Sequence, residues 1–135
     1  MHRRSAAGAL AIFAIGVVGF LPARAAMAQE SRLEGSWSGG GSVTFASGDR
    51  ERARCRANYS RRSNDRYVLS ATCATPSGRS AQTANLQRVG RNSFQGSFYN
   101  REYDVSGTIH VVVHGNSQDV RLSGSAGSAF FRLSR

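Results

Sequence analysis

Two cysteines and a run of alternating arginines are the residues of this chain whose types and spacing indicate chemistry. Cys55 and Cys73 are the only cysteines, and each lies in a run where small or apolar residues alternate with polar ones. Strict period-two alternation is typical of β-strands. If the two runs form a hairpin centred on Asn64, residues 55 and 73 are equidistant from the centre and face each other. This register predicts a disulfide, and it also pairs two further inward positions on each run: Ala57 with Ala71, and Tyr59 with Leu69.

A column of arginines occupies the opposite face of the first run, where residues two apart are separated by about 7 Å. The column continues around the following turn, and the candidate anion-binding residues are Arg50, Arg52, Arg54, Arg56, Arg61, Arg62 and Arg66. The neighbouring outward positions are expected to hold serine, threonine, glycine and valine, so no ion-pair partners are predicted. Repulsion between arginines at this spacing in water is only about 0.6 kcal/mol. The column therefore fits either a solvated face that discourages edge aggregation or a site for a polyanion.

The remaining polar residues form no catalytic or metal-binding pattern. His110 and His114 are expected about 13 Å apart along one strand, which is too far for both to ligate one metal ion. No serine lies in a Gly-x-Ser-x-Gly turn that opens a helix, and nothing positions Glu102 and Asp104 as an acid–base pair. Packing within the turn explains the aromatic loop 99–103 better than stacking on a sugar or base. We therefore expect no enzymatic activity, no metal and no cofactor.

The first 28 residues are predicted to be a secretory signal peptide rather than part of the fold. Two arginines precede an apolar stretch from Ala6 to Leu21, and residues 26–28 read Ala-Met-Ala, the small-x-small pattern of a cleavage site. Residues 29–135 then form one domain, in which no further apolar segment has membrane-spanning length. Export together with two cysteines favours one disulfide in an oxidising compartment, either periplasmic or extracellular.

The charge of the chain favours acidic partners. All 18 basic residues are arginine, and the whole chain carries 8 acidic residues. Three arginines lie in the predicted signal peptide, which leaves 15 in the predicted domain. An excess of basic residues attracts anionic surfaces and polymers. Outside the cytosol, lipopolysaccharide or an acidic polysaccharide is a more suitable partner than nucleic acid.

Eight short alternating segments fill residues 29–135, and no helical periodicity is present. The expected strands are 35–45, 51–59, 67–73, 80–86, 93–99, 105–113, 119–123 and 128–134. Strands at this spacing favour a sandwich or a barrel. Because every connection is short, the simplest topology is an all-β, eight-stranded antiparallel up-and-down barrel in which the first strand pairs with the last. An open sandwich is the alternative.

The interior of such a barrel is either filled by side chains or holds one small ligand. The expected inward residues include Trp37, Phe94 and Phe98, and this aromatic content favours a filled barrel. A carrier of a small apolar ligand is the alternative, and it requires a cavity that these side chains leave open.

The segment Gly35-Ser36-Trp37 resembles the Gly-x-Trp opening of lipocalin-like (calycin) barrels. In those barrels an arginine near the chain end packs over the tryptophan, a role that the resemblance assigns to Arg132 or Arg135. The early cysteine pair and the ending Leu133-Ser134-Arg135 are also similar to small periplasmic inhibitors of bacterial metalloproteases (the Inh/Omp19 type). That similarity implies a protease as partner. In those inhibitors the segment before the barrel enters the protease cleft, and here the corresponding segment 29–33 is short.

The sequence thus predicts an exported barrel with one disulfide that acts as a non-enzymatic binding or structural module of the cell envelope. Its expected contact is an anionic polymer on the arginine column. A periplasmic protease inhibitor and a carrier of a small apolar ligand are the two alternatives.

Overall fold

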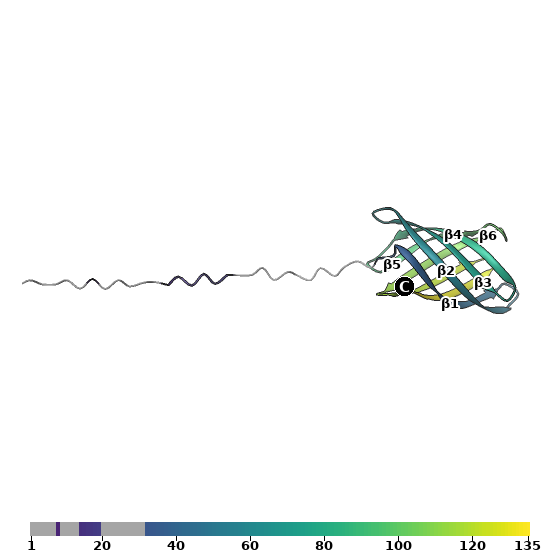
Figure 1. Cartoon of the computed structure of the whole chain (residues 1–135). Helices are drawn as coiled ribbons and strands as arrows, with labels where there is room; N and C mark the ends of the chain where they lie inside the picture. The colour runs from purple at the N-terminus through teal and green to yellow at the C-terminus, as the bar shows by residue number, and fades with distance from the viewer. Residues whose placement is uncertain (1–7, 9–13, 20–31) are drawn as a thin grey trace, which may run out of the picture.

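The computed structural model describes residues 8, 14–19 and 32–135, and it shows one closed β-barrel (Figure 1). Eight antiparallel strands follow one another around it: β1 (Gly35–Phe45), β2 (Arg50–Ser63), β3 (Arg66–Thr75), β4 (Gly78–Arg88), β5 (Ser93–Asn100), β6 (Val105–His114), β7 (Ser117–Gly124) and β8 (Gly127–Ser134). The predicted fold class is confirmed, and the strand bounds differ from the predicted ones mainly by a few residues at the ends.

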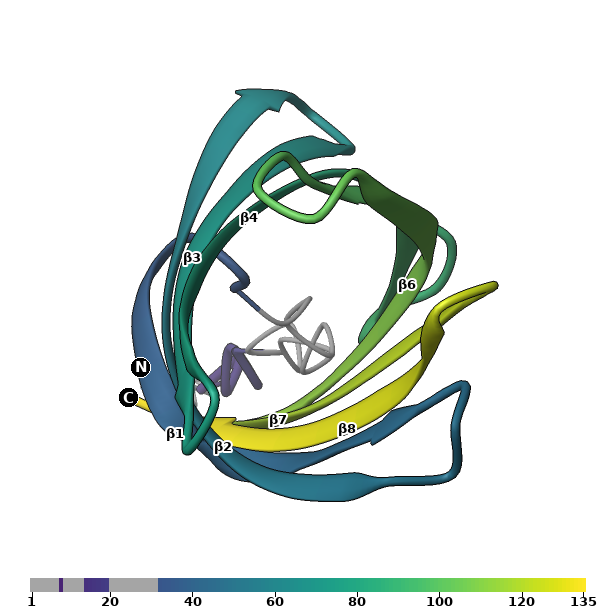
Figure 2. The same ribbon diagram turned by 90° about the vertical axis from the view of Figure 1, so that its right-hand side faces the viewer.

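Closure of the barrel depends on the pairing of β1 with β8, which runs from Ser38 opposite Ser134 to Phe45 opposite Gly127. Figure 2 views the barrel along its axis and shows these two strands side by side in a continuous ring. Each of the other strand pairs joins neighbours in the sequence. The alternative of an open sandwich is excluded, since the first and last strands share a full ladder of partners.

The predicted signal peptide, residues 1–28, lies outside the described residues except for residue 8 and residues 14–19, which belong to no helix or strand. Cleavage after residue 28 therefore stays a prediction. In the described part of the chain, no helix is long and apolar enough to cross a membrane.

The β2–β3 hairpin has the register that alternation predicts. Cys55 lies opposite Cys73, their Cα atoms are 4.1 Å apart, and their sulfurs form a disulfide. The two further predicted pairs are also present: Ala57 with Ala71 and Tyr59 with Leu69. Both cysteines are buried, so the crosslink lies on the inner side of the barrel wall.

The turn of this hairpin is tighter than predicted. The strands predicted at 51–59 and 67–73 leave the polar residues between them for the turn, but β2 continues to Ser63 and β3 begins at Arg66. Only residues 64 and 65 connect the strands, and the register shifts between Arg61 and Ser63. Polar residues suit an exposed strand extension as well as a loop, which is why composition alone placed the turn too broadly.

Alternation separates a buried inner face from an exposed outer face along the whole barrel. Three expected inward residues, Val43, Phe45 and Val105, are less buried because they lie at or near strand ends, and Phe45 is 39% exposed. The other large residues expected to face inward are all buried: Trp37, Tyr59, Tyr67, Leu69, Leu86, Phe94, Phe98, Ile109, Val111, Val113, Val120, Leu122, Phe131 and Leu133.

Two inward glycines permit the close approach of neighbouring strands. A Cβ atom at Gly41 would collide with the carbonyl oxygen of Phe130, and one at Gly96 would collide with the carbonyl oxygen of Asn85. Glycine in a strand allows such approach and a sharp bend, and bends of this kind curve a sheet into a barrel. These positions also contribute no side chain to the interior.

We predict that replacing both cysteines by alanine lowers the free energy of unfolding by about 3 kcal/mol, because the crosslink closes a loop whose ends are 18 residues apart. Urea unfolding of wild type and the Cys55→Ala/Cys73→Ala variant measures the difference. Reductant should bring wild type to the stability of the variant and leave the variant unchanged. Equal stability of the two proteins under oxidising conditions would contradict the prediction.

Candidate functional site

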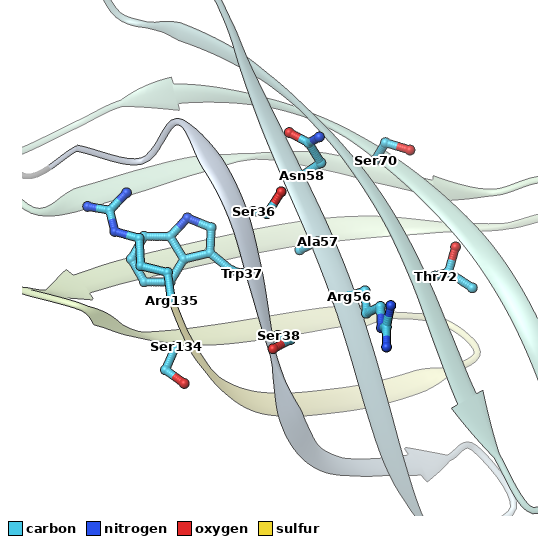
Figure 3. A pocket seen from close by; sticks show the side chains of 10 residues that line it. All are labelled: Ser36, Trp37, Ser38, Arg56, Ala57, Asn58, Ser70, Thr72, Ser134 and Arg135. Carbon is cyan, nitrogen blue, oxygen red and sulfur yellow. The ribbon is translucent and has the colours of Figure 1, made fainter.

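One end of the barrel is closed by a plug of three residues. The Trp37 indole Nε1 donates a hydrogen bond to the Leu33 carbonyl oxygen at 2.9 Å, and both residues are buried. The Arg135 guanidinium lies over the indole, 4.3 Å from the ring centroid (Figure 3). Arg135 also donates to the carbonyl oxygen of Glu34 at 3.0 Å. Leu33, which the sequence assigned to the lead-in before the barrel, is thus part of its core.

Arg132, the other arginine that the resemblance offered for this role, lies elsewhere. It is exposed on the outer face of β8, and its Nε lies 3.0 Å from Oδ1 of Asp119. Its neighbours Phe131 and Leu133 are buried, so alternation directs residue 132 outward. Arg135 follows the last residue of β8 and is free of that constraint, which lets its side chain fold back over the barrel end.

The half of the interior next to this plug is filled. The Tyr59 hydroxyl donates to the buried Gln118 Oε1 at 2.6 Å. Tyr67 and Phe94 make an edge-to-face ring contact with centroids 5.3 Å apart. Gln118 was not predicted as a core residue because its side chain is polar, but it shares inward parity with Val120 on β7. The prediction that aromatic side chains fill the barrel is therefore confirmed for this half.

The opposite end of the barrel opens into a cup of about 380 Å³. Apolar side chains from six strands line it: Val43, Cys73, Phe98, Val105, Leu122, Ala129 and Phe131. The expectation of a filled barrel is wrong at this end. Gly124, Gly127 and Ala129 are among the residues that line the cup, and their short side chains leave this space open.

The rim of the cup is held by polar contacts. The side-chain oxygen of Asn100 accepts hydrogen bonds from the backbone N–H groups of Glu102 at 3.1 Å and Tyr103 at 3.3 Å. This cap orders the loop between β5 and β6 and places Tyr103 on the cup wall. On the opposite rim the Ser77 hydroxyl donates to the Glu51 carboxylate, which joins β2 to the turn between β3 and β4. Neither rim contact was predicted from the sequence.

The predicted arginine column lies on the outside of the wall, away from the cup. Arg52, Arg54 and Arg56 are exposed on β2, and within the described residues they have no ion-pair partner. Arg50 at the start of β2 is also exposed, and its guanidinium lies 3.5 Å from the Ser42 hydroxyl. The structure therefore gives the column the outward direction that alternation predicts.

The three arginines near the hairpin tip are less uniform. Arg62 and Arg66 are exposed, but Arg61 has the parity of the inward residue Tyr59 and lies just beyond the barrel end. It points to Glu34, with 3.9 Å between Nη1 and the carboxylate, and donates to the carbonyl oxygen of Ser63 at 3.1 Å. Arg61 therefore belongs to the closed end rather than to the column.

The two histidines of β6, His110 and His114, have different neighbours. His114 Nε2 is 3.9 Å from Oδ2 of Asp119, whereas His110 lies on β6 opposite Arg121. Among the described residues, no group of three or more metal-ligating side chains is close enough to hold an ion.

Comparisons with known proteins show the fold and no family. No family model and no curated protein matches the chain. Three designed proteins are similar in structure: the redesigned barrel mFAP1 bound to DFHBI (TM-score 0.65, 12% identity), the redesigned barrel b11L5F_LGL (0.60, 13%) and a fluorescence-activating barrel designed de novo (0.59, 11%). Each alignment covers 76% of this chain and at least 90% of the other. These identities support a common barrel architecture only.

The buried Tyr59 hydroxyl predicts a pH-dependent contribution to stability. Burial raises the pKa of this phenol well above its ordinary value of 10.0. The protonated phenol therefore contributes fully below pH 10, and its contribution is lost as the pH rises toward the folded-state pKa. At pH 7, Tyr59→Phe should lower the free energy of unfolding by about 1–3 kcal/mol, because Gln118 loses its donor.

Urea unfolding at pH 7 and pH 10.5 tests this dependence, with Tyr103→Phe on the exposed rim as the control. The difference between wild type and Tyr59→Phe should shrink at the higher pH, and the control should match wild type at pH 7. A difference for Tyr59→Phe that is the same at both values would contradict the prediction.

Because Arg135 contacts Trp37 and Arg132 does not, we predict that their substitution has different effects on tryptophan fluorescence. Arg135→Ala should lower the free energy of unfolding by about 1 kcal/mol and change the emission of Trp37, the single tryptophan. Arg132→Ala should leave that emission unchanged, because its contact is with Asp119. Fluorescence spectra and thermal melts of both variants provide the measurement, and equal emission changes would contradict the assignment.

Proposed function

We propose that this protein is an exported, non-enzymatic binding protein that holds a small apolar molecule in the cup at the open end of the barrel. The observation that carries the proposal is the cup itself, whose volume of about 380 Å³ lies in the range of roughly 300–1,000 Å³ typical of ligand sites. Sites of that kind combine a mainly apolar wall with a few polar groups, which is the composition described above.

The residues of the cup define the class of ligand. Within the described residues, no charged side chain lines it, and the polar lining groups include Ser80 and Gln82 on β4 and Asn100 on β5. The side-chain oxygen of Asn100 already accepts two backbone hydrogen bonds, and we assign the orientation of a ligand to Ser80 and Gln82, two of the remaining polar residues of the lining. An uncharged molecule with an apolar body and one or two polar atoms fits this arrangement.

The closed barrel favours binding because its wall is formed in advance. Every strand has two hydrogen-bonded neighbours, and the disulfide lies in the wall, with Cys73 on the cup surface. Preformed sites lose less free energy to ordering when a ligand binds. The structural similarity to the barrel mFAP1, which was solved bound to DFHBI, supports small-molecule binding by a barrel of this architecture.

The other functions considered from the sequence have less support. Protease inhibition by a free leading segment does not fit Leu33, which is buried and whose carbonyl oxygen accepts a hydrogen bond from Trp37. The disulfide indicates a non-cytoplasmic location, and with the predicted signal peptide we assign the protein to the periplasm or the medium. The arginine column lies on the outer face and is separate from the cup.

We predict that an uncharged fluorescent probe, N-phenyl-1-naphthylamine, binds in the cup with one-to-one stoichiometry. The absence of charge on this probe avoids attraction by the arginines. Ala129→Trp introduces a large side chain into the cup and should weaken binding at least about tenfold, which corresponds to about 1.4 kcal/mol. Ala81→Trp, on the outer face of β4, is the matched control and should bind as wild type does.

Fluorescence titration measures the affinity of the three proteins, and thermal melts establish that both variants are folded. Absence of saturable binding to wild type, or equal affinity of wild type and Ala129→Trp, would overturn the proposal. If the probe binds as predicted, native mass spectrometry of the protein purified from its own cells identifies the natural ligand by mass.

A further inference from the structure

The outer face of β1–β3 carries two hollows that are independent of the cup. One of about 590 Å³ is lined by Arg54 and Arg56 on β2, by Arg79 on β4 and by small residues of β1 and β3. A second of about 430 Å³ continues toward the closed end. The two share Ser38, Arg56 and Thr72, so they form one groove along the barrel wall. Figure 3 shows Arg56 between Ser38 on β1 and Thr72 on β3.

We propose that this arginine groove, defined by Ser38, Arg54, Arg56, Thr72 and Arg79, binds a linear acidic polysaccharide. The groove forms because β2 presents long side chains between two strands that present short ones. Register places Arg56 between Ser38 and Thr72, and Arg54 between Gly40 and Ala74. The arginines therefore stand above a floor of small side chains, which leaves space for a chain to lie along them.

The electrostatics of this face favour an anionic chain. The outward positions of β1 to β4 contain no aspartate or glutamate, and Arg54, Arg56 and Arg79 make no ion pair among the described residues. Successive outward positions on a strand are about 7 Å apart. A guanidinium binds carboxylate or sulfate through paired, charge-assisted hydrogen bonds, so repeated acidic groups along one chain can occupy successive arginines.

The uncharged residues on this face favour a polysaccharide as the anionic ligand. In the groove and in the second hollow that continues it, hydroxyl and amide groups suit sugar hydroxyls: Ser36, Ser38, Asn58, Ser70, Thr72 and Ser134. No aromatic side chain is outward on β1–β4, so the base stacking used by proteins that bind single-stranded nucleic acid is missing. Val68 is the largest apolar side chain outward on these strands, which does not provide the apolar face that insertion into a lipid surface requires.

Titration calorimetry of the wild-type protein with alginate, a linear polyuronate, tests this proposal. About 50 mM salt is suitable, because contacts between arginines and carboxylates are screened less there than at physiological salt. The groove variant Arg54→Ser/Arg56→Ser/Arg79→Ser should bind at least about tenfold more weakly, since it loses three contacts to carboxylates, and its affinity should depend less on salt. The matched control Arg91→Ser/Arg101→Ser/Arg121→Ser removes the same charge elsewhere and should bind within about twofold of wild type.

Several outcomes would overturn the proposal. An equal loss in both triple variants would mean that net charge alone determines binding. Tighter binding to phosphatidylglycerol vesicles would indicate a lipid surface, and tighter binding to single-stranded oligothymidylate would indicate nucleic acid. Thermal melts verify that the variants are folded. The cup variant Ala129→Trp should bind alginate as wild type does, which separates failure of this groove from failure of the cup.

Discussion

The pairing of β1 with β8 is the constraint on which the rest of this structure depends. It joins Ser38 to Ser134 and removes both sheet edges, so that alternation in each strand becomes a division between inside and outside. The plug at one end follows from the same pairing, because β8 delivers Arg135 to the indole of Trp37 at the start of β1. Without closure, neither the cup nor the sealed end would exist.

One barrel wall thus carries two surfaces of opposite chemistry. On β3, Cys73 lines the apolar cup, whereas Thr72 lies in the arginine groove on the outer face. A small uncharged molecule and an anionic chain would therefore contact alternate residues of the same strands without competing for them. Each surface can be changed by substitutions that leave the other intact, provided that the closed ladder and the disulfide are kept.

Much of the fold could be predicted because its determinants are local. Alternation and turn residues located all eight strands, and symmetry about residue 64 identified the partners Cys55 and Cys73. The direction of the arginines on β2 followed from the same period. What could not be predicted depends on individual side-chain contacts that strand alternation does not describe. Leu33 acquires its role only when its carbonyl oxygen meets the Trp37 indole, and Gln118 only when it meets the Tyr59 hydroxyl. The cup was harder to foresee for a related reason, because the aromatic residues were counted as one interior, yet Phe98 lines the cup and Phe94 lies in the filled half.

The meander also determines the order in which the barrel can fold. Seven of the eight strand pairs join consecutive strands, so their contacts can form quickly and in any order. The pair β1–β8 joins residues as far apart as Ser38 and Ser134 and must wait for the last strand. Until then the sheet has two unpaired edges that can associate with other chains. A folding molecule is consequently most exposed to aggregation in the interval before its final strand pairs.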